Sequence, residues 1–147
     1  MLVEVKVKVS RIVEGKTKKL SETYILNKEF FAQAEYDVQS LITRDVEVGT
    51  VDTFEIQSIK ISQIKELAYN QQGETTFIAT LKDVQLDEKG NEKALRYKVL
   101  LWADSLTQAD RRAHDLAREG YDMTVEGIKQ VDYIYLTEIE ETEETNE

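Results

Sequence analysis

The chain has 147 residues, 41% of them hydrophobic, which is enough for one domain with a real core or for two small repeats that share one. It has no cysteine and a single histidine, which excludes disulfides, thiolate metal sites and a zinc site built on a histidine cluster. The net charge of −10 does not exclude nucleic acid, because residues 1–28 hold seven Lys/Arg against three Glu.

The first part of the chain predicts a hairpin followed by a helix. Residues 14–16 form the predicted turn, residues 18–26 the second strand and residues 30–43 the helix. The first strand is the clearest in the sequence, because its valines alternate with polar residues and so define a core face. These valines are Val3, Val5, Val7 and Val9.

A polar connection over residues 44–50 precedes a third predicted strand over 53–64. The step of three between Ile56 and Ile59 breaks the alternation of this strand, and a β-bulge would return both residues to one face. A later strand repeats the break, at an offset of 72, at Ile128, Val131 and Tyr133. Residues 65–73 predict an exposed polar loop.

The second part of the chain predicts the same succession of elements. Strands over 75–86 and 93–102 flank the turn-forming cluster of residues 87–91, and a helix over 105–118 and a strand over 123–136 follow. Ser105, with Gln108 three residues later, has the spacing of a capping box, and Gly120 is the predicted helix stop.

A shift of 75 positions aligns the two parts. It lays Leu20, Tyr24 and Leu26 on Leu95, Val99 and Leu101, and Phe31, Ala34, Val38 and Leu41 on Leu106, Ala109, Ala113 and Leu116. The sequence therefore predicts an α+β fold of two tandem ββαβ repeats with antiparallel sheets, related by a pseudo-twofold, with the helices packed on one sheet side. Residues 1–137 are predicted to be a single domain made of repeats 1–64 and 74–137.

Residues 138–147 contain six glutamates and one apolar residue, Ile139. Such a segment cannot offset its ordering entropy by burial, so we predict an acidic flexible tail.

No catalytic motif is found in the sequence: it has no phosphate-cradling glycine loop, no G-x-S-x-G and no paired-histidine metal motif. We therefore predict a protein that is not an enzyme, with no catalytic or metal-binding residues and no cofactor. His114 is predicted to be a solvated surface residue. Asp83, Asp87 and Glu88 near a hairpin end are predicted to be solvated, with a turn or a weak cation site as the alternatives.

The outward faces of the predicted hairpins carry basic residues and a tryptophan. Such residues can track a phosphate backbone and stack bases, although lysines on a sheet also serve to prevent edge-to-edge aggregation. The candidate nucleic-acid-binding residues are Lys6, Lys8, Lys19, Arg96, Lys98 and Trp102.

The chain resembles an uncharacterised family of small proteins from gut Bacteroidetes and their crAss-like phages. The resemblance rests on residues 5–9 (Val-Lys-Val-Lys-Val), on Tyr24-Ile25-Leu26 before a helix that contains Phe31 and Ala34-Glu35, and on residues 87–90 (Asp-Glu-Lys-Gly). Phe30 departs from the pattern, since a capping Ser or Thr is expected there. The phage replication context that this resemblance implies suggests a role in binding single-stranded DNA.

We therefore predict a non-enzymatic protein that binds single-stranded DNA or RNA, as a phage or mobile-element replication accessory in the cytoplasm of a bacterial or phage-infected host cell. The basic strands and acidic tail are similar to the plan of single-stranded DNA-binding proteins, whose tails also recruit replication proteins. The main alternative is an acidic protein-interaction module, such as an adaptor or host-defence inhibitor, and a third hypothesis is an enzyme with an unrecognised carboxylate site. No membrane partner is expected, and homo-oligomerisation is left open.

Overall fold

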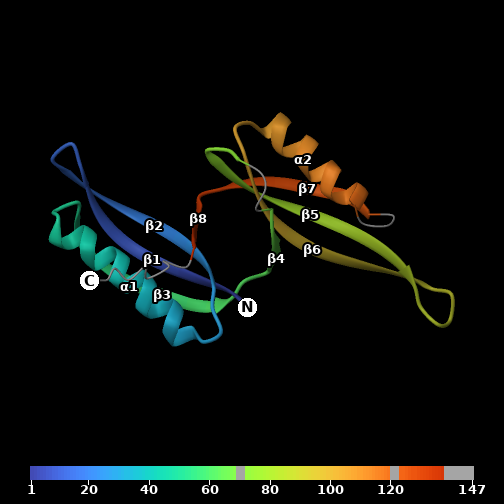
Figure 1. Cartoon of the computed structure of the whole chain (residues 1–147), viewed down its shortest axis with the longest axis horizontal. Coiled ribbons are helices and arrows are strands. Elements are labelled where there is room, and N and C mark those ends of the chain that lie inside the picture. Colours follow the sequence, from blue (N-terminus) through green and yellow to red (C-terminus); the bar gives the residue numbers. More distant parts are fainter. Residues whose placement is uncertain (69–71, 120–122, 138–147) are drawn as a thin grey trace, which may run out of the picture. The chain divides into compact units, whose positions relative to one another are not determined.

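The computed structural model describes residues 1–68, 72–119 and 123–137 (Figure 1). Two helices and two four-stranded sheets confirm the α+β class. In chain order the elements are β1 (Leu2–Val13), β2 (Lys16–Asn27), α1 (Phe31–Glu47), β3 (Val51–Ile61), β4 (Ile64–Leu67), β5 (Thr75–Leu86), β6 (Glu92–Ala103), α2 (Leu106–Glu119), β7 (Met123–Val131) and β8 (Tyr133–Leu136).

The chain divides into two compact units. Unit 1 consists of Met1–Ser62 with the C-terminal segment from Tyr133, and unit 2 consists of Gln63–Asp132. The sheet of unit 1 has the order β3-β1-β2-β8, and that of unit 2 has the order β4-β6-β5-β7. The chain thus leaves unit 1 after β3, completes unit 2, and returns to supply β8 at the edge of the first sheet (Figure 1).

The core of unit 1 lies between α1 and the valine face of its sheet. The alternating valines of β1 are 0–2% exposed, as the sequence predicts, and they pack with Tyr24 and Leu26 of β2. From α1 the core receives Ala34, Val38 and Ile42. The side of the sheet opposite α1 is called the outer face of unit 1 below.

The core of unit 2 is built in the same way, with smaller side chains on its helix. Phe77, Ala79 and Leu81 of β5 meet three buried alanines of α2. Phe31 and Leu106, which the predicted helix stripes included, are 42% and 60% exposed. Each is the first residue of its helix, where the apolar stripe has only just begun.

Three sequence predictions about the strands are wrong. The sheets are not purely antiparallel, because β2 pairs with β8 and β4 with β6 in parallel. The predicted loop over 65–73 begins inside strand β4, where Ile64 and Leu67 are 3% and 6% exposed. The predicted strand 123–136 divides at Asp132 into β7 and β8, which belong to different sheets. Strands β4 and β8 have four residues each, which is too short for an alternation pattern to be recognised in the sequence.

One of the two expected bulges is confirmed, and the position predicted for the other is wrong. The β1–β3 register shifts between Lys6 and Val7, which confirms the bulge between Ile56 and Ile59. In the later strand the shift falls between the partners of Thr80 and Leu81, so the bulge lies between Val125 and Ile128 rather than beyond Ile128.

Side-chain hydrogen bonds cap the N-terminal ends of both helices. Gln108 N–H donates to Ser105 Oγ (3.1 Å), and Gln108 Oε1 accepts from the N–H of Asp104 (2.7 Å), close to the predicted capping box. At α1, Gln33 Oε1 accepts from the N–H of Phe30 (3.0 Å), which supplies one half of a cap without Ser or Thr. The predicted stop at Gly120 and the tail 138–147 lie outside the described residues.

Candidate nucleic-acid interface

Strand alternation places Lys6 and Lys8 on the outer face of unit 1, because the neighbouring valines face α1. Lys6 lies opposite Thr23 of β2 and Ser58 of β3, and Lys8 lies opposite Ser21 and Glu55. Both lysines are exposed. The outer face is thus a row of ammonium groups flanked mainly by hydroxyl groups.

A cavity of about 460 Å³ opens on three strands of unit 1. Lys8, Lys19, Ser10, Ser21, Thr53 and Glu55 line it together with Val9, Leu20 and Phe54. The first six residues share the outer face by register, since Lys8 lies opposite Ser21 and Glu55, and Ser10 lies opposite Lys19 and Thr53. The structure therefore brings two of the predicted basic residues, Lys8 and Lys19, into one hydroxyl-lined concavity.

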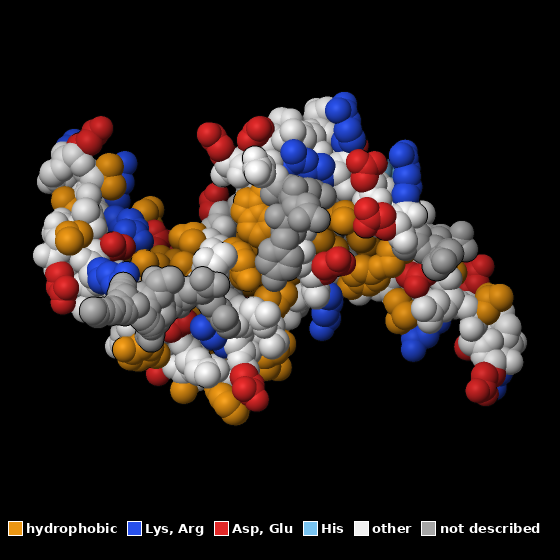
Figure 2. All heavy atoms as spheres, viewed as in Figure 1, with side chains coloured by type: hydrophobic (Ala, Val, Ile, Leu, Met, Phe, Trp, Pro, Cys, Tyr) orange, Lys and Arg blue, Asp and Glu red, His pale blue; other side chains and the backbone are white. Residues whose placement is uncertain are grey.

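Neither lysine of this cavity forms an ion pair within residues 1–68, 72–119 and 123–137. Farther along the same face, Lys60 Nζ lies 3.5 Å from Glu4 Oε2. Figure 2 shows basic side chains along the β1–β2 hairpin, interspersed with carboxylates. On the outer face of unit 1, Lys6, Lys8 and Lys19 thus carry charges that form no ion pair within the described residues.

The predicted basic residues of unit 2 have protein partners. Arg96 Nε donates to both carboxylate oxygens of Glu126 on β7, at 2.9 and 2.7 Å. Lys98 Nζ donates to Gln63 Oε1 at 3.0 Å. These contacts partly satisfy the positive charge of Arg96 and the donor groups of Lys98.

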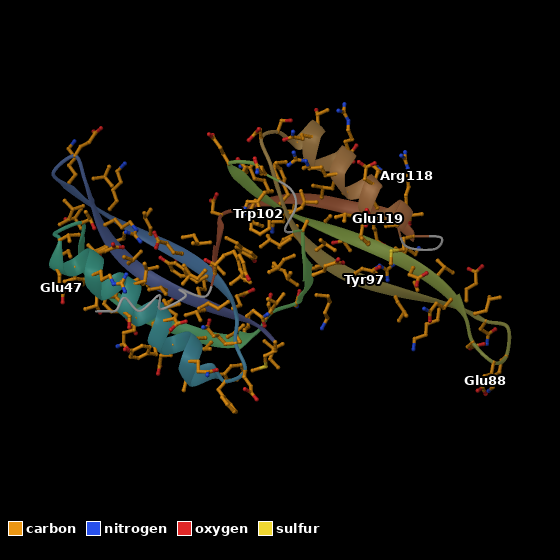
Figure 3. The ribbon with its side chains drawn as sticks, viewed as in Figure 1. Glu47, Glu88, Tyr97, Trp102, Arg118 and Glu119 are labelled. Carbon is orange, nitrogen blue, oxygen red and sulfur yellow. The ribbon has the colours of Figure 1, made fainter. Side chains whose placement is uncertain are left out.

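Trp102 lies at the end of β6 and is partly buried (Figure 3). Its backbone carbonyl accepts a hydrogen bond from Arg112 Nη1 of α2 at 2.6 Å, and Arg112 also donates to the carbonyl of Gln72. Trp102 lies opposite Thr76, on the sheet side that also carries Arg96 and Lys98.

Sequence reasoning missed Lys82 and Lys129, which lie on the same sheet side of unit 2. Lys82 lies directly opposite Arg96, and Lys129 lies opposite Ile78. Alternation along β5 from the predicted inward residues could have found Lys82. Lys129 could have been placed in the same way from Ile128, because the pairing of β7 with β5 is regular from Gly127 to Val131.

A partly buried ionic cluster lies on the core side of the first hairpin, in the half nearer its turn. Arg11 contacts Glu22 of β2 and Asp45 of α1 at 2.5 and 3.2 Å, and the hydroxyl of Tyr24 donates to Glu22 at 2.6 Å. Burial alone would raise the pKa of the Glu22 carboxyl, but hydrogen bonds from Arg11 and Tyr24 outweigh burial and hold the pKa below its usual value. Burial, together with the bond to Glu22, raises the pKa of Tyr24.

The acidic residues near the second hairpin tip include a turn-forming aspartate. Asp87 Oδ1 accepts from the N–H groups of Lys89 and Asn91 at 2.9 and 2.8 Å, and Gly90 takes a positive φ of 79°. Glu88 is exposed at this tip (Figure 3). His114 is half exposed and lies 3.3 Å from Asp110, one helical turn earlier.

The described ranges contain no group of three or more His, Cys, Asp or Glu side chains that could hold a metal ion. Among the described helices, none is long and apolar enough to cross a membrane.

Comparisons with the curated proteins and with the solved structures found no match. A family model matches residues 1–141, and the chain therefore belongs to the family described as "Domain of unknown function (DUF4494)".

Proposed function

We propose that this protein is a non-enzymatic, single-stranded nucleic-acid-binding protein that uses the outer face of unit 1. The observation that carries the proposal is the cavity that combines Lys8 and Lys19 with the hydroxyls of Ser10, Ser21 and Thr53. Ammonium and hydroxyl groups are the side-chain donors that contact phosphate oxygens. Lys6 lies on the same strand and the same face as Lys8, so it adds a positive charge beside the cavity.

Preference for a single strand requires a surface on which exposed bases can stack. Trp102, which belongs to unit 2, is the one tryptophan of the chain and is partly accessible, so we propose it as a separate stacking residue on that unit. Because it is unique, its fluorescence reports directly on stacking. We expect an oligothymidine strand to quench this fluorescence and a duplex of the same length to quench it less.

The test is a fluorescence-anisotropy titration of labelled DNA and RNA strands across a salt series. The Lys8→Gln/Lys19→Gln variant should weaken binding and reduce the slope of log K against log salt by about 1.4, since each lost phosphate contact contributes about 0.7 for a single strand. The Lys65→Gln/Lys89→Gln variant is the matched control, because it removes the same charge from two exposed lysines outside the cavity. Binding no tighter than about millimolar at low salt would reject the proposal.

We also propose that the two units arose by duplication of one ββαβ element. Three observations support this history: the sheet orders β3-β1-β2-β8 and β7-β5-β6-β4 correspond, a register shift follows both Lys6 of β1 and Thr80 of β5, and each helix packs buried apolar residues on its sheet. An experimental structure in which β1–β2–α1–β3 failed to superpose on β5–β6–α2–β7 would contradict the duplication.

The resemblance to proteins of gut Bacteroidetes and their phages leads us to propose a replication accessory role in the bacterial or infected-cell cytoplasm.

A further inference from the structure

The side of the unit 2 sheet opposite α2, called the outer face of unit 2 below, gathers four basic side chains. The core residues of β5 alternate with residues that point away from α2. Among the latter, Lys82 lies opposite Arg96 of β6, and Thr80, one row away, lies opposite Lys98. Lys129 of β7 belongs to the next row. Because successive rows on one face are about 6.8 Å apart, the four cations lie within roughly 14 Å along the strands.

This arrangement is electrostatically unfavourable for the sheet itself. Like charges directly opposite each other on neighbouring strands destabilise the pairing of those strands, as with Lys82 and Arg96. Within the described residues, Lys82, Lys98 and Lys129 form no ion pair. Arg96 and Lys129 are exposed, and the other two cations are partly exposed. An anion bound on this face would therefore relieve a repulsion that the fold leaves in place.

Glu126 already supplies one negative charge to this face. Its two carboxylate oxygens lie 2.9 and 2.7 Å from Arg96 Nε. Since β5 lies between β6 and β7, the Arg96–Glu126 pair reaches across the strand that carries Lys82 (Figure 1). The side chains of Arg96 and Glu126 are 51% and 41% exposed, so the pair is weak and another anion can replace the carboxylate.

A phosphate group suits this surface better than the Glu126 carboxylate. Arginine presents a planar fork of five N–H donors that fits a phosphate bidentately, whereas the two bonds that Glu126 accepts use Nε alone. In the adjacent row, Lys98 and Thr80 supply an ammonium and a hydroxyl group, which are donors that contact phosphate oxygens. Trp102 lies one row beyond Lys129 on the same face, where it can stack a base.

We propose that the outer face of unit 2 is a second binding surface for the phosphate backbone of a single strand, and that Glu126 occupies a phosphate position until the strand replaces it. The inference rests on the proposed function, because the ligand is the same, and it adds a site on the other unit. The phosphates contact Lys82, Arg96, Lys98 and Lys129. Glu126 acts as an internal competitor that lowers the affinity of this surface.

The first test isolates unit 2 by starting from the full chain with Lys8→Gln/Lys19→Gln, in which the cavity of unit 1 has lost its positive charge. Anisotropy titration with a short labelled oligothymidine strand should still detect binding. Adding Lys82→Gln/Lys129→Gln should weaken this residual binding about tenfold at low salt and reduce the slope of log K against log salt by about 1.4, since each lost phosphate contact contributes about 0.7 for a single strand. The added pair should also reduce the quenching of Trp102 fluorescence.

Two matched controls lie on α2, on the other side of the sheet. Adding Arg111→Gln/Arg118→Gln removes the same charge from exposed side chains and should leave the residual binding nearly unchanged. In the same starting chain, Glu126→Gln should tighten binding about two- to fivefold at low salt, the range expected for releasing an exposed ion pair. Glu119→Gln alters the net charge by the same amount and should have little effect (Figure 3).

Complete loss of oligonucleotide binding in the Lys8→Gln/Lys19→Gln variant would overturn this second surface and leave the interface of unit 1 standing. A Lys82→Gln/Lys129→Gln effect no larger than that of the α2 arginine control would also overturn it, as would equal effects of the two glutamate substitutions. The reverse pattern, in which Lys82→Gln/Lys129→Gln weakens binding and Lys8→Gln/Lys19→Gln does not, would support this surface and reject the interface of unit 1.

Discussion

Arg11 and Glu22 form a bidentate ion pair between β1 and β2, with Nε–Oε2 at 2.5 Å and Nη2–Oε1 at 2.7 Å. The two residues are not opposite each other in the ladder, because Arg11 lies opposite Lys18 and Glu22 opposite Val7. The guanidinium therefore extends along the strand pair, and its remaining donor reaches Asp45 of α1. One side chain joins both strands of the first hairpin to the helix that covers them.

Replacing Arg11 by methionine should lower the free energy of unfolding by about 2 kcal/mol. The side chains of Arg11 and Glu22 are 24% and 14% exposed, so the loss of one partner leaves a carboxylate with little water. Urea denaturation measures the change. Arg118→Met is the control, because Arg118 is 81% exposed and its pair with Asp115 should contribute less than about 1 kcal/mol (Figure 3). Equal effects of the two substitutions would contradict a specific role for Arg11.

Glu22 should make the protein less stable in acid. Its folded-state pKa lies below the unfolded value, so the stabilisation is present above about pH 4.5 and is lost as the pH falls through the folded-state pKa. The Glu22→Gln variant should be less stable at neutral pH and should show a smaller fall in stability between neutral pH and about pH 3. Urea midpoints measured across this range decide the matter, and parallel curves for the two proteins would exclude Glu22 as a source of the acid sensitivity.

Leu67→Ala should destabilise the protein by about 2–4 kcal/mol, although Leu67 lies in a segment that the sequence predicts to be an exposed loop. The reason is that Leu67 is 6% exposed and its strand pairs with β6. Leu86→Ala is the matched control, because Leu86 is 71% exposed near a hairpin tip, and it should change stability by less than about 0.5 kcal/mol. Thermal or urea unfolding with a Leu67→Ala effect as small as the control would show that β4 contributes little.

Deleting residues 138–147 should tighten single-strand binding, most of all at low salt. The segment carries six glutamates, and a tethered anion competes with phosphate at an effective concentration on the order of millimolar. Added salt weakens both contacts, so the difference between the full and truncated chains should shrink as salt rises. Anisotropy titrations measure this difference. Identical affinities at low salt would contradict competition by this segment.

The sequence alone determined the elements whose signals are local. The valine alternation of β1 predicted a buried face because side chains alternate every second residue. Ser105 and Gln108 marked the start of α2 because a helix terminus needs acceptors for its first N–H groups. Residues 87–91 marked the second hairpin turn because their types suit a tight reversal.

Tertiary structure alone decided which distant segments meet. Nothing in Ile64–Leu67 or Tyr133–Leu136 shows that these strands pair in parallel with β6 and β2, because four-residue runs carry almost no period and their pairing depends on partners far along the chain. The same holds for the bulge at Glu126, which lies before Ile128, whereas the sequence pattern indicates one between Ile128 and Val131. Leu106, which the sequence predicts to be core, likewise stays exposed because it is the first residue of α2, where the packed part of the helix has only just begun.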